Sequence, residues 1–131
     1  MTFPDVPAVP EPTALDELAA KIAAFSQYLD DSYRRPWWAL WRPRVSVEAV
    51  MWRRSAKVGE EFGEAMQALG GMLGENPRKG VTHTREQVVG EQLDVALCAL
   101  GSVEHLTGNK GRSVALLVEK MDYVNKRAGL S

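Results

Sequence analysis

Four carboxylates stand in two pairs of identical spacing, and they are the residues of this sequence best suited to chemistry. Glu61 and Glu64 form one pair, and Glu91 and Asp94 form the other. A helix turns about 100° per residue, so a spacing of three places both members of a pair on one helical face. Carboxylate oxygens are the ligands that Mg²⁺ and Mn²⁺ prefer. The spacing therefore predicts a divalent metal site where the two pairs meet.

The surroundings of both pairs are apolar, which makes solitary charges costly. Glu61 borders the apolar stripe expected for its helix, and Asp94 lies in an otherwise apolar run between Leu93 and Leu100. A carboxylate taken out of water without a partner costs free energy, so the pairs should meet each other or a cation. For Glu60 the sequence leaves open whether it is a simple solvated charge.

The elements that must position these residues are predicted to be helices, because apolar residues recur at steps of three and four. The expected helices run from Thr13 to before Pro36, from Ser46 to about Leu73, over about 85–107 and over about 113–128. The apolar stripes are expected at Leu15, Leu18, Ile22, Phe25 and Leu29 in the first helix, and at Val58, Phe62, Ala65, Leu69 and Met72 in the second. No strand pattern of useful length appears, so the fold class is all-α.

Local signals fix the ends of these helices. Thr84 with Gln87 forms a capping box, Thr13 with Asp16 is a plausible N-cap, and Gly70, Gly71 and Gly74 should weaken and stop the second helix. The almost wholly apolar run 93–100 predicts that the third helix is central and buried on more than one side.

If the second and third helices form an antiparallel hairpin, the carboxylates of the two helices lie at similar distances from the connecting loop, measured along the helix axes. At 1.5 Å per residue, Glu64 lies about 13 Å from the end of its helix, and Glu91 lies about 11 Å from the start of the next. Glu61 and Asp94 lie at about 18 Å and 15 Å. Glu64 should therefore face Glu91, and Glu61 should face Asp94.

The ordered motif resembles the signature of the MazG-like NTP pyrophosphatases, E-x-x-E followed by E-x-x-D. The resemblance covers about residues 45–128, and the doubled Glu60 and the upstream Lys57 also look like that family. It implies a four-helix MazG-like bundle that hydrolyses a nucleoside triphosphate to a monophosphate and pyrophosphate, with Mg²⁺ as cofactor. By motif match, the metal ligands would be Glu61, Glu64, Glu91 and Asp94.

Several further residues could serve this chemistry. Glu60 or one of the ligand carboxylates, such as Glu61, would accept a proton from the attacking water. Lys57 lies one turn before Glu61, where it could bind substrate or simply pair with Glu61. Substrate phosphates could also be reached by Lys120, Asn125 and Lys126 on the last helix, although basic residues favour helix C-termini in any case.

Tryptophans are the candidates for stacking on a nucleobase. Trp52 comes first, and Trp37, Trp38 and Trp41 follow in a connector rich in arginine between residues 33 and 44. Tryptophan and arginine are also enriched in interface hot spots, so the connector could instead seal a contact between subunits. The family resemblance implies a homodimer or homotetramer with helices packed across the interface.

Composition limits the remaining possibilities. The chain has 131 residues, 45% of them hydrophobic and 25% charged, which is typical of one soluble domain, here 13–131 after a proline-rich tail 1–12. A net charge of −1 argues against a globally basic nucleic-acid partner, and no apolar run approaches the roughly 20 residues of a membrane span. With Cys98 as its single cysteine and no signal-peptide pattern, the chain is expected in the cytoplasm.

Other site chemistries find no support in the sequence. His83 and His105 are too few for a zinc site, and neither has the Glu-x-x-His spacing of a di-iron bundle. The glycine-containing segment 74–80 lacks the ending of a phosphate-binding loop. The leading hypothesis is the pyrophosphohydrolase. The alternatives are a non-catalytic helical interaction protein, and a DNA-associated regulator that the near-neutral charge disfavours.

Overall fold

The computed structural model describes residues 12–130, and within them the protein is all-α, as predicted. The elements are α1 (Pro12–Ser32), a short 3₁₀ helix η1 (Trp37–Ala39), α2 (Val47–Leu73), α3 (Arg85–Leu106) and α4 (Ser113–Ala128). The predicted tail 1–12 lies outside the described residues except for Pro12, which begins α1 one residue earlier than expected. The proposed Thr13 cap also lies outside, since its side chain is not described.

The helix ends follow the local signals. Ser46 Oγ accepts a hydrogen bond from the Ala49 amide at 3.1 Å and caps α2. The Gln87 amide donates to Thr84 Oγ1 at 3.2 Å while the Thr84 amide donates to Gln87 Oε1 at 2.8 Å, which completes the predicted capping box of α3. Gly74 adopts the left-handed conformation, with φ 66°, and ends α2.

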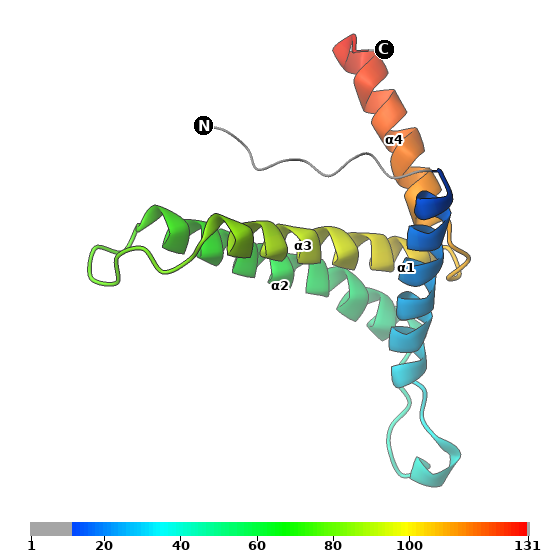
Figure 1. The fold of residues 1–131 in the computed structure, drawn as a ribbon. Helices are drawn as coiled ribbons and strands as arrows, with labels where there is room; N and C mark the ends of the chain where they lie inside the picture. Colours follow the sequence, from blue (N-terminus) through cyan, green and yellow to red (C-terminus); the bar gives the residue numbers. More distant parts are fainter. Residues whose placement is uncertain (1–11, 131) are drawn as a thin grey trace.

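Two long helices form an antiparallel hairpin, and the other two lie at one end of it. Figure 1 shows α2 and α3 side by side, α1 crossing near the C-terminal end of α3, and α4 leading away from the hairpin. The predicted hairpin is therefore confirmed. The four helices do not all run alongside one another in this chain, so a MazG-like bundle is not confirmed. No helix within residues 12–130 is long and apolar enough to cross a membrane.

Contrary to the sequence prediction, Gly70 and Gly71 do not end α2 but form a contact with the loop that follows the helix. The helix continues through both, and the following loop folds back against them, with the Thr82 amide donating to the Gly71 carbonyl at 2.9 Å. A Cβ on Gly71 would collide with His83 Nδ1, and one on Gly70 would lie 2.8 Å from Glu75 Oε2. The two glycines permit a close approach of loop and helix.

The buried apolar residues are few and mostly small. Among the described residues they are Ile22, Ala23, Ala39, Val50, Ala65, Ala68, Val88 and Val114. Leu93 is 58% exposed and Leu97 is 49% exposed, so the prediction that α3 is buried on more than one side is wrong for the single chain. The reason is geometric: only α2 covers α3 along its length, while α1 and α4 meet its C-terminal end (Figure 1).

The buried faces of α1 and α2 are also rotated from the expected stripes. In α1 the small residues Ala23 and Ser26 are buried beside Ile22, whereas Phe25 is exposed. In α2 Phe62 is exposed and its neighbour Glu61 is buried. Small and polar side chains thus form the helix contacts, and larger apolar ones lie on the flanks.

A buried arginine ties three helices together. Arg54 of α2 donates to Asp30 Oδ1 at 2.8 Å, to the Ser26 side chain at 2.8 Å and carbonyl at 3.1 Å, and to the Gly101 carbonyl at 2.8 Å. The second oxygen of Asp30 lies 2.8 Å from His105 Nδ1 and accepts from Asn109 at the same distance. We call Arg54, Asp30, His105 and Asn109 the Arg54 network.

The electrostatics of this network keep Asp30 ionised. Burial raises the pKa of Asp30, but the hydrogen bonds from His105 and Asn109, and the charges of His105 and Arg54, outweigh burial and lower it overall. Asp30 therefore balances the charge of Arg54 within the protein.

Glu104 of α3 sets where α4 begins. Its side chain is fully buried and accepts hydrogen bonds from the Gly111 amide at 2.9 Å and the Ser113 amide at 2.6 Å. A carboxylate in this place satisfies free amides at the start of α4 and interacts favourably with the helix dipole.

Candidate metal centre

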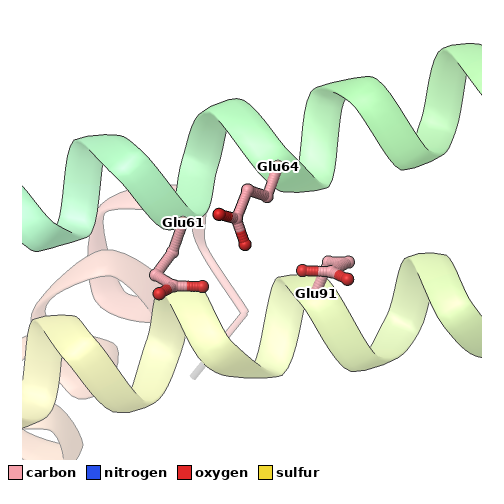
Figure 2. Close-up of side chains that lie close together, drawn as sticks. All are labelled: Glu61, Glu64 and Glu91. Carbon is pink, nitrogen blue, oxygen red and sulfur yellow. The ribbon is translucent and has the colours of Figure 1, made fainter.

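Three carboxylates converge in the middle of the hairpin. Glu61 and Glu64 project from α2 and Glu91 projects from α3, all into the space between the two helices, as Figure 2 shows. One oxygen of each lies within 4.8 Å of the others. The height argument from the sequence thus places Glu64 and Glu91 opposite each other correctly, because both helices have the predicted ends.

The three carboxylates differ in exposure, and together they are short of positive charge. Glu61 is only 8% exposed, Glu91 is half-buried, and Glu64 is exposed. Like charges at this separation repel, more strongly where burial lowers the local dielectric. Lys57 lies 2.7 Å from Glu61 Oε1, and it is the one cation in a salt bridge with any of the three among the described residues. A divalent cation between the carboxylates would remove this repulsion.

Lys57 makes the ion pair that the sequence suggested as one of two roles. Its Nζ also lies 3.0 Å from Glu60 Oε1, and the hydrogen bonds to Glu61 and Glu60 raise the pKa of Lys57. The same side chain lines the cavity described next, where it could also meet a substrate. Glu60 itself is exposed at the edge of that cavity.

A cavity of about 810 Å³ lies beside Glu61, between α1 and the hairpin. Glu61 and Asp94 both line it, so Asp94 faces the same space, although it does not belong to the group of three carboxylates. Its apolar wall includes Phe25, Leu29 and Leu97. The cavity is within the size range of small-ligand sites, and it joins an apolar wall to acidic groups.

Cys98 lies on the wall of this cavity, as a half-buried free thiol. Burial raises the pKa of Cys98, and the negative charge of Glu61 raises it further. Both effects favour the protonated thiol over the reactive thiolate.

Other predicted site residues lie away from the carboxylates in this chain. Trp52 is on α2, nine residues before Glu61, and is exposed outside the cavity beside Glu61. Lys120, Asn125 and Lys126 are on α4, which leads away from the hairpin (Figure 1), and Lys120 lies 5.5 Å from the Tyr123 ring centre. Within one chain, the structure does not bring these residues to the site.

Sequence reasoning missed the contribution of α1 to the cavity. Phe25 and Leu29 of α1 line it together with Tyr33, the residue that follows the helix, and the three recur at steps of four. That spacing was a usable signal for a common face, but the sequence does not show which element the face meets.

The donor set fits a hard divalent cation. All three side chains are carboxylates, and two oxygens bound to the same Mg²⁺ can be at most about 4 Å apart. Small side-chain rotations would bring oxygens that lie within 4.8 Å of one another into this range. No protein-family model, curated protein or solved structure matches the chain.

Proposed function

We propose that this protein is a Mg²⁺-dependent nucleoside triphosphate pyrophosphohydrolase of the MazG-like class that works as a homo-oligomer. The observation that carries the proposal is the convergence of Glu61, Glu64 and Glu91 from two helices on one point. Mn²⁺ could replace Mg²⁺ with the same ligands. Cleavage of non-canonical (d)NTPs, as in nucleotide house-cleaning, is the role that this activity suggests.

The cavity beside the carboxylates supports the proposal. A nucleoside triphosphate combines a polyanion with a flat base, and the cavity combines an acidic edge with the apolar wall of Phe25, Leu29 and Leu97. The acidic edge alone would repel the triphosphate. A bound divalent cation would neutralise phosphate charge and polarise the α-phosphorus toward attack.

The remaining steps belong to side chains of this chain. Glu61, Glu64 and Glu91 would be the metal ligands, and Asp94 would complete the set from the adjoining wall of the cavity. Glu60 or a ligand carboxylate would accept the proton of the attacking water. Lys57 would contribute positive charge near the phosphates and hold Glu60 and Glu61 in place.

The surface of the single chain supports an oligomer. Its accessible area is 10335 Å², whereas a compact monomer of 14.5 kDa has roughly 6,900 Å². Even if residues 1–11 are given the roughly 1,700 Å² of a fully extended chain, about half of the excess, roughly 1,700 Å², remains. That excess is about twice the area that one partner buries in a standard interface.

The exposed apolar residues are of the types that subunit interfaces commonly bury. They lie on all four helices, and outside the cavity beside Glu61 they include Leu18, Phe62, Leu93 and Met121. A second copy packed on these flanks would also be the route by which α4 residues such as Lys126 reach the carboxylates of another chain.

The decisive experiment is an assay of pyrophosphate release from a panel of dNTPs with Mg²⁺. We expect release from at least one dNTP, and its loss in EDTA. Calorimetry should detect Mg²⁺ or Mn²⁺ uptake by the wild type. The proposal would be overturned if no dNTP of the panel released pyrophosphate and calorimetry detected no metal uptake. That result would favour a non-catalytic helical interaction protein, an alternative that the exposed apolar residues on the helices also support.

Glu60→Gln would assign the proton acceptor. Glu60 is exposed and outside the group of three carboxylates, so metal affinity should persist in this variant. Turnover that falls with unchanged metal affinity would make Glu60 the base. Unchanged turnover would give the role to a ligand carboxylate.

A further inference from the structure

A second cavity, of about 630 Å³, lies under the connector between α1 and α2. Its charged side chains are Arg34, Arg35 and Arg44 from the connector region and Asp30 and His105 from the helices. It shares only Tyr33 with the cavity beside the carboxylates. Glu61, Glu64 and Glu91 do not line it, so it is a separate site with separate chemistry.

The net charge of this cavity is positive. Asp30 is the one acidic residue in its wall, and both oxygens of Asp30 are already bonded within the Arg54 network. Arg34 lies 3.2 Å from Asp31, which offsets part of its charge. Arg44 has no hydrogen bond or salt bridge among residues 12–130, and Arg35 bonds only neutral carbonyls there. Within the described residues, neither of these two guanidinium groups has a carboxylate partner.

The connector holds a defined shape without a ligand. Arg35 Nη1 donates to the Leu40 carbonyl at 2.8 Å and to the Arg42 carbonyl at 3.0 Å, which closes the loop on itself. Ala39 is fully buried and anchors η1. A site that is formed in advance loses less conformational entropy when it binds a ligand.

An aromatic ring faces solvent at the same cavity. Trp37 lines it and is 84% exposed. The ring of Tyr33 is already covered by Arg53, whose Cζ lies 5.6 Å from the ring centre. Trp37 is thus the free platform on which a flat ligand could stack.

We propose that this cavity binds a nucleotide directly, without a metal ion. Arg44 and Arg35 would hold the phosphates, because guanidinium groups make paired hydrogen bonds to phosphate oxygens. Trp37 would stack on the base. This inference does not rest on the proposed pyrophosphohydrolase, because no carboxylate ligand takes part.

The test is to titrate the full chain with ADP in the presence of EDTA and to measure the binding heat by isothermal titration calorimetry. We expect saturable binding with Kd below about 1 mM. Adenosine lacks the phosphates and inorganic pyrophosphate lacks the ring, so each should bind at least about tenfold more weakly. EDTA removes any divalent cation, so metal-dependent binding at the carboxylates does not contribute, and the connector variants below identify the cavity that binds ADP.

Matched variants of the connector sharpen the test. Arg44→Gln and Trp37→Leu should each weaken ADP binding about tenfold or more. Arg42→Gln and Trp38→Leu remove the same groups from the same connector but outside the cavity, and they should bind within about twofold of the wild type.

Three results would overturn the inference. They are no saturable ADP binding, equal losses in the cavity variants and their controls, and binding of a single-stranded oligonucleotide but not of ADP. The last result would make the connector a nucleic-acid surface instead. Equal affinity for pyrophosphate and ADP would contradict stacking on Trp37.

Discussion

Two charged residues on the buried face of α2, seven residues apart, have opposite surroundings. Arg54 has hydrogen-bond partners on α1 and α3, including the ionised Asp30. Glu61 has one cation, Lys57, and it faces two further carboxylates. Both side chains are almost fully buried.

The difference separates a charge whose partners are all within the fold from one that, on the proposed function, awaits a metal ion. A buried charge whose hydrogen-bonding capacity is met holds elements together, and removal of its partner is costly. A buried charge set among like charges raises the free energy of the fold until a ligand relieves it, and such groups are typical of functional sites. The four predictions below test this contrast, from the largest expected effect to the smallest.

On the proposed function, Glu61→Gln should reduce metal-dependent turnover by at least about a thousandfold, because it removes the most buried of the proposed ligands. Stability without metal should change by less than about 1 kcal/mol, since lower repulsion offsets the lost Lys57 pair. Pyrophosphate release and urea denaturation measure the two effects. Glu48→Gln, an exposed change in the first turn of the same helix, is the control and should retain activity.

Arg54→Met should destabilise the fold by about 3–5 kcal/mol, because it leaves Asp30 and the Gly101 carbonyl without their buried donor. Urea denaturation of the variant gives this value. The double variant Arg54→Met/Asp30→Asn should recover part of the loss, since it removes the stranded carboxylate. A loss below about 1 kcal/mol in the single variant would place Arg54 among ordinary surface charges.

Mn²⁺ or Mg²⁺ at about a hundred times Kd should stabilise the wild type by about 2.7 kcal/mol through mass action. The thermal midpoint, followed with and without EDTA, measures this effect. Glu64→Gln and Glu91→Gln should abolish most of the gain. Glu119→Gln on α4, which removes a carboxylate away from the site, should leave it intact.

Acid should weaken the Arg54 network in a way that depends on Asp30. Its pKa in the folded protein is below the unfolded value, so its contribution is complete above about pH 4 and is lost as pH falls through the folded pKa. The stability gap between wild type and Asp30→Asn should therefore be constant near neutrality and narrow below pH 4. A constant gap down to pH 2 would show that the Asp30 charge has no part in it.

Features set by nearby residues could be predicted from the sequence. The caps at Ser46 and Thr84 act over three residues, and the left-handed turn at Gly74 needs only its own backbone. Once those ends are fixed, the rise per residue determines which carboxylates face each other. This is why the meeting of Glu64 and Glu91 was predicted correctly.

Features set by distant residues could not be predicted in this way. Arg54 bonds residues 24 to 47 positions away, and no periodic pattern records such contacts. The face that a helix buries depends on its neighbours, so Phe62 was predicted inside and is outside. Asp94 follows Glu91 by three residues, about one helical turn. This offset leaves Asp94 outside the group of three carboxylates, although it still lines the cavity beside Glu61.

The carboxylate of Glu104 has a consequence well beyond its own surroundings. Through the amides of Gly111 and Ser113, this side chain joins the start of α4 to the C-terminal part of α3. A helix of 16 residues is about 24 Å long, so a small rotation at its N-terminal end displaces its C-terminal end by several ångströms. The position of the basic end of α4, which carries Lys126 and Arg127, is therefore sensitive to how the buried carboxylate of Glu104 holds the first residues of the helix.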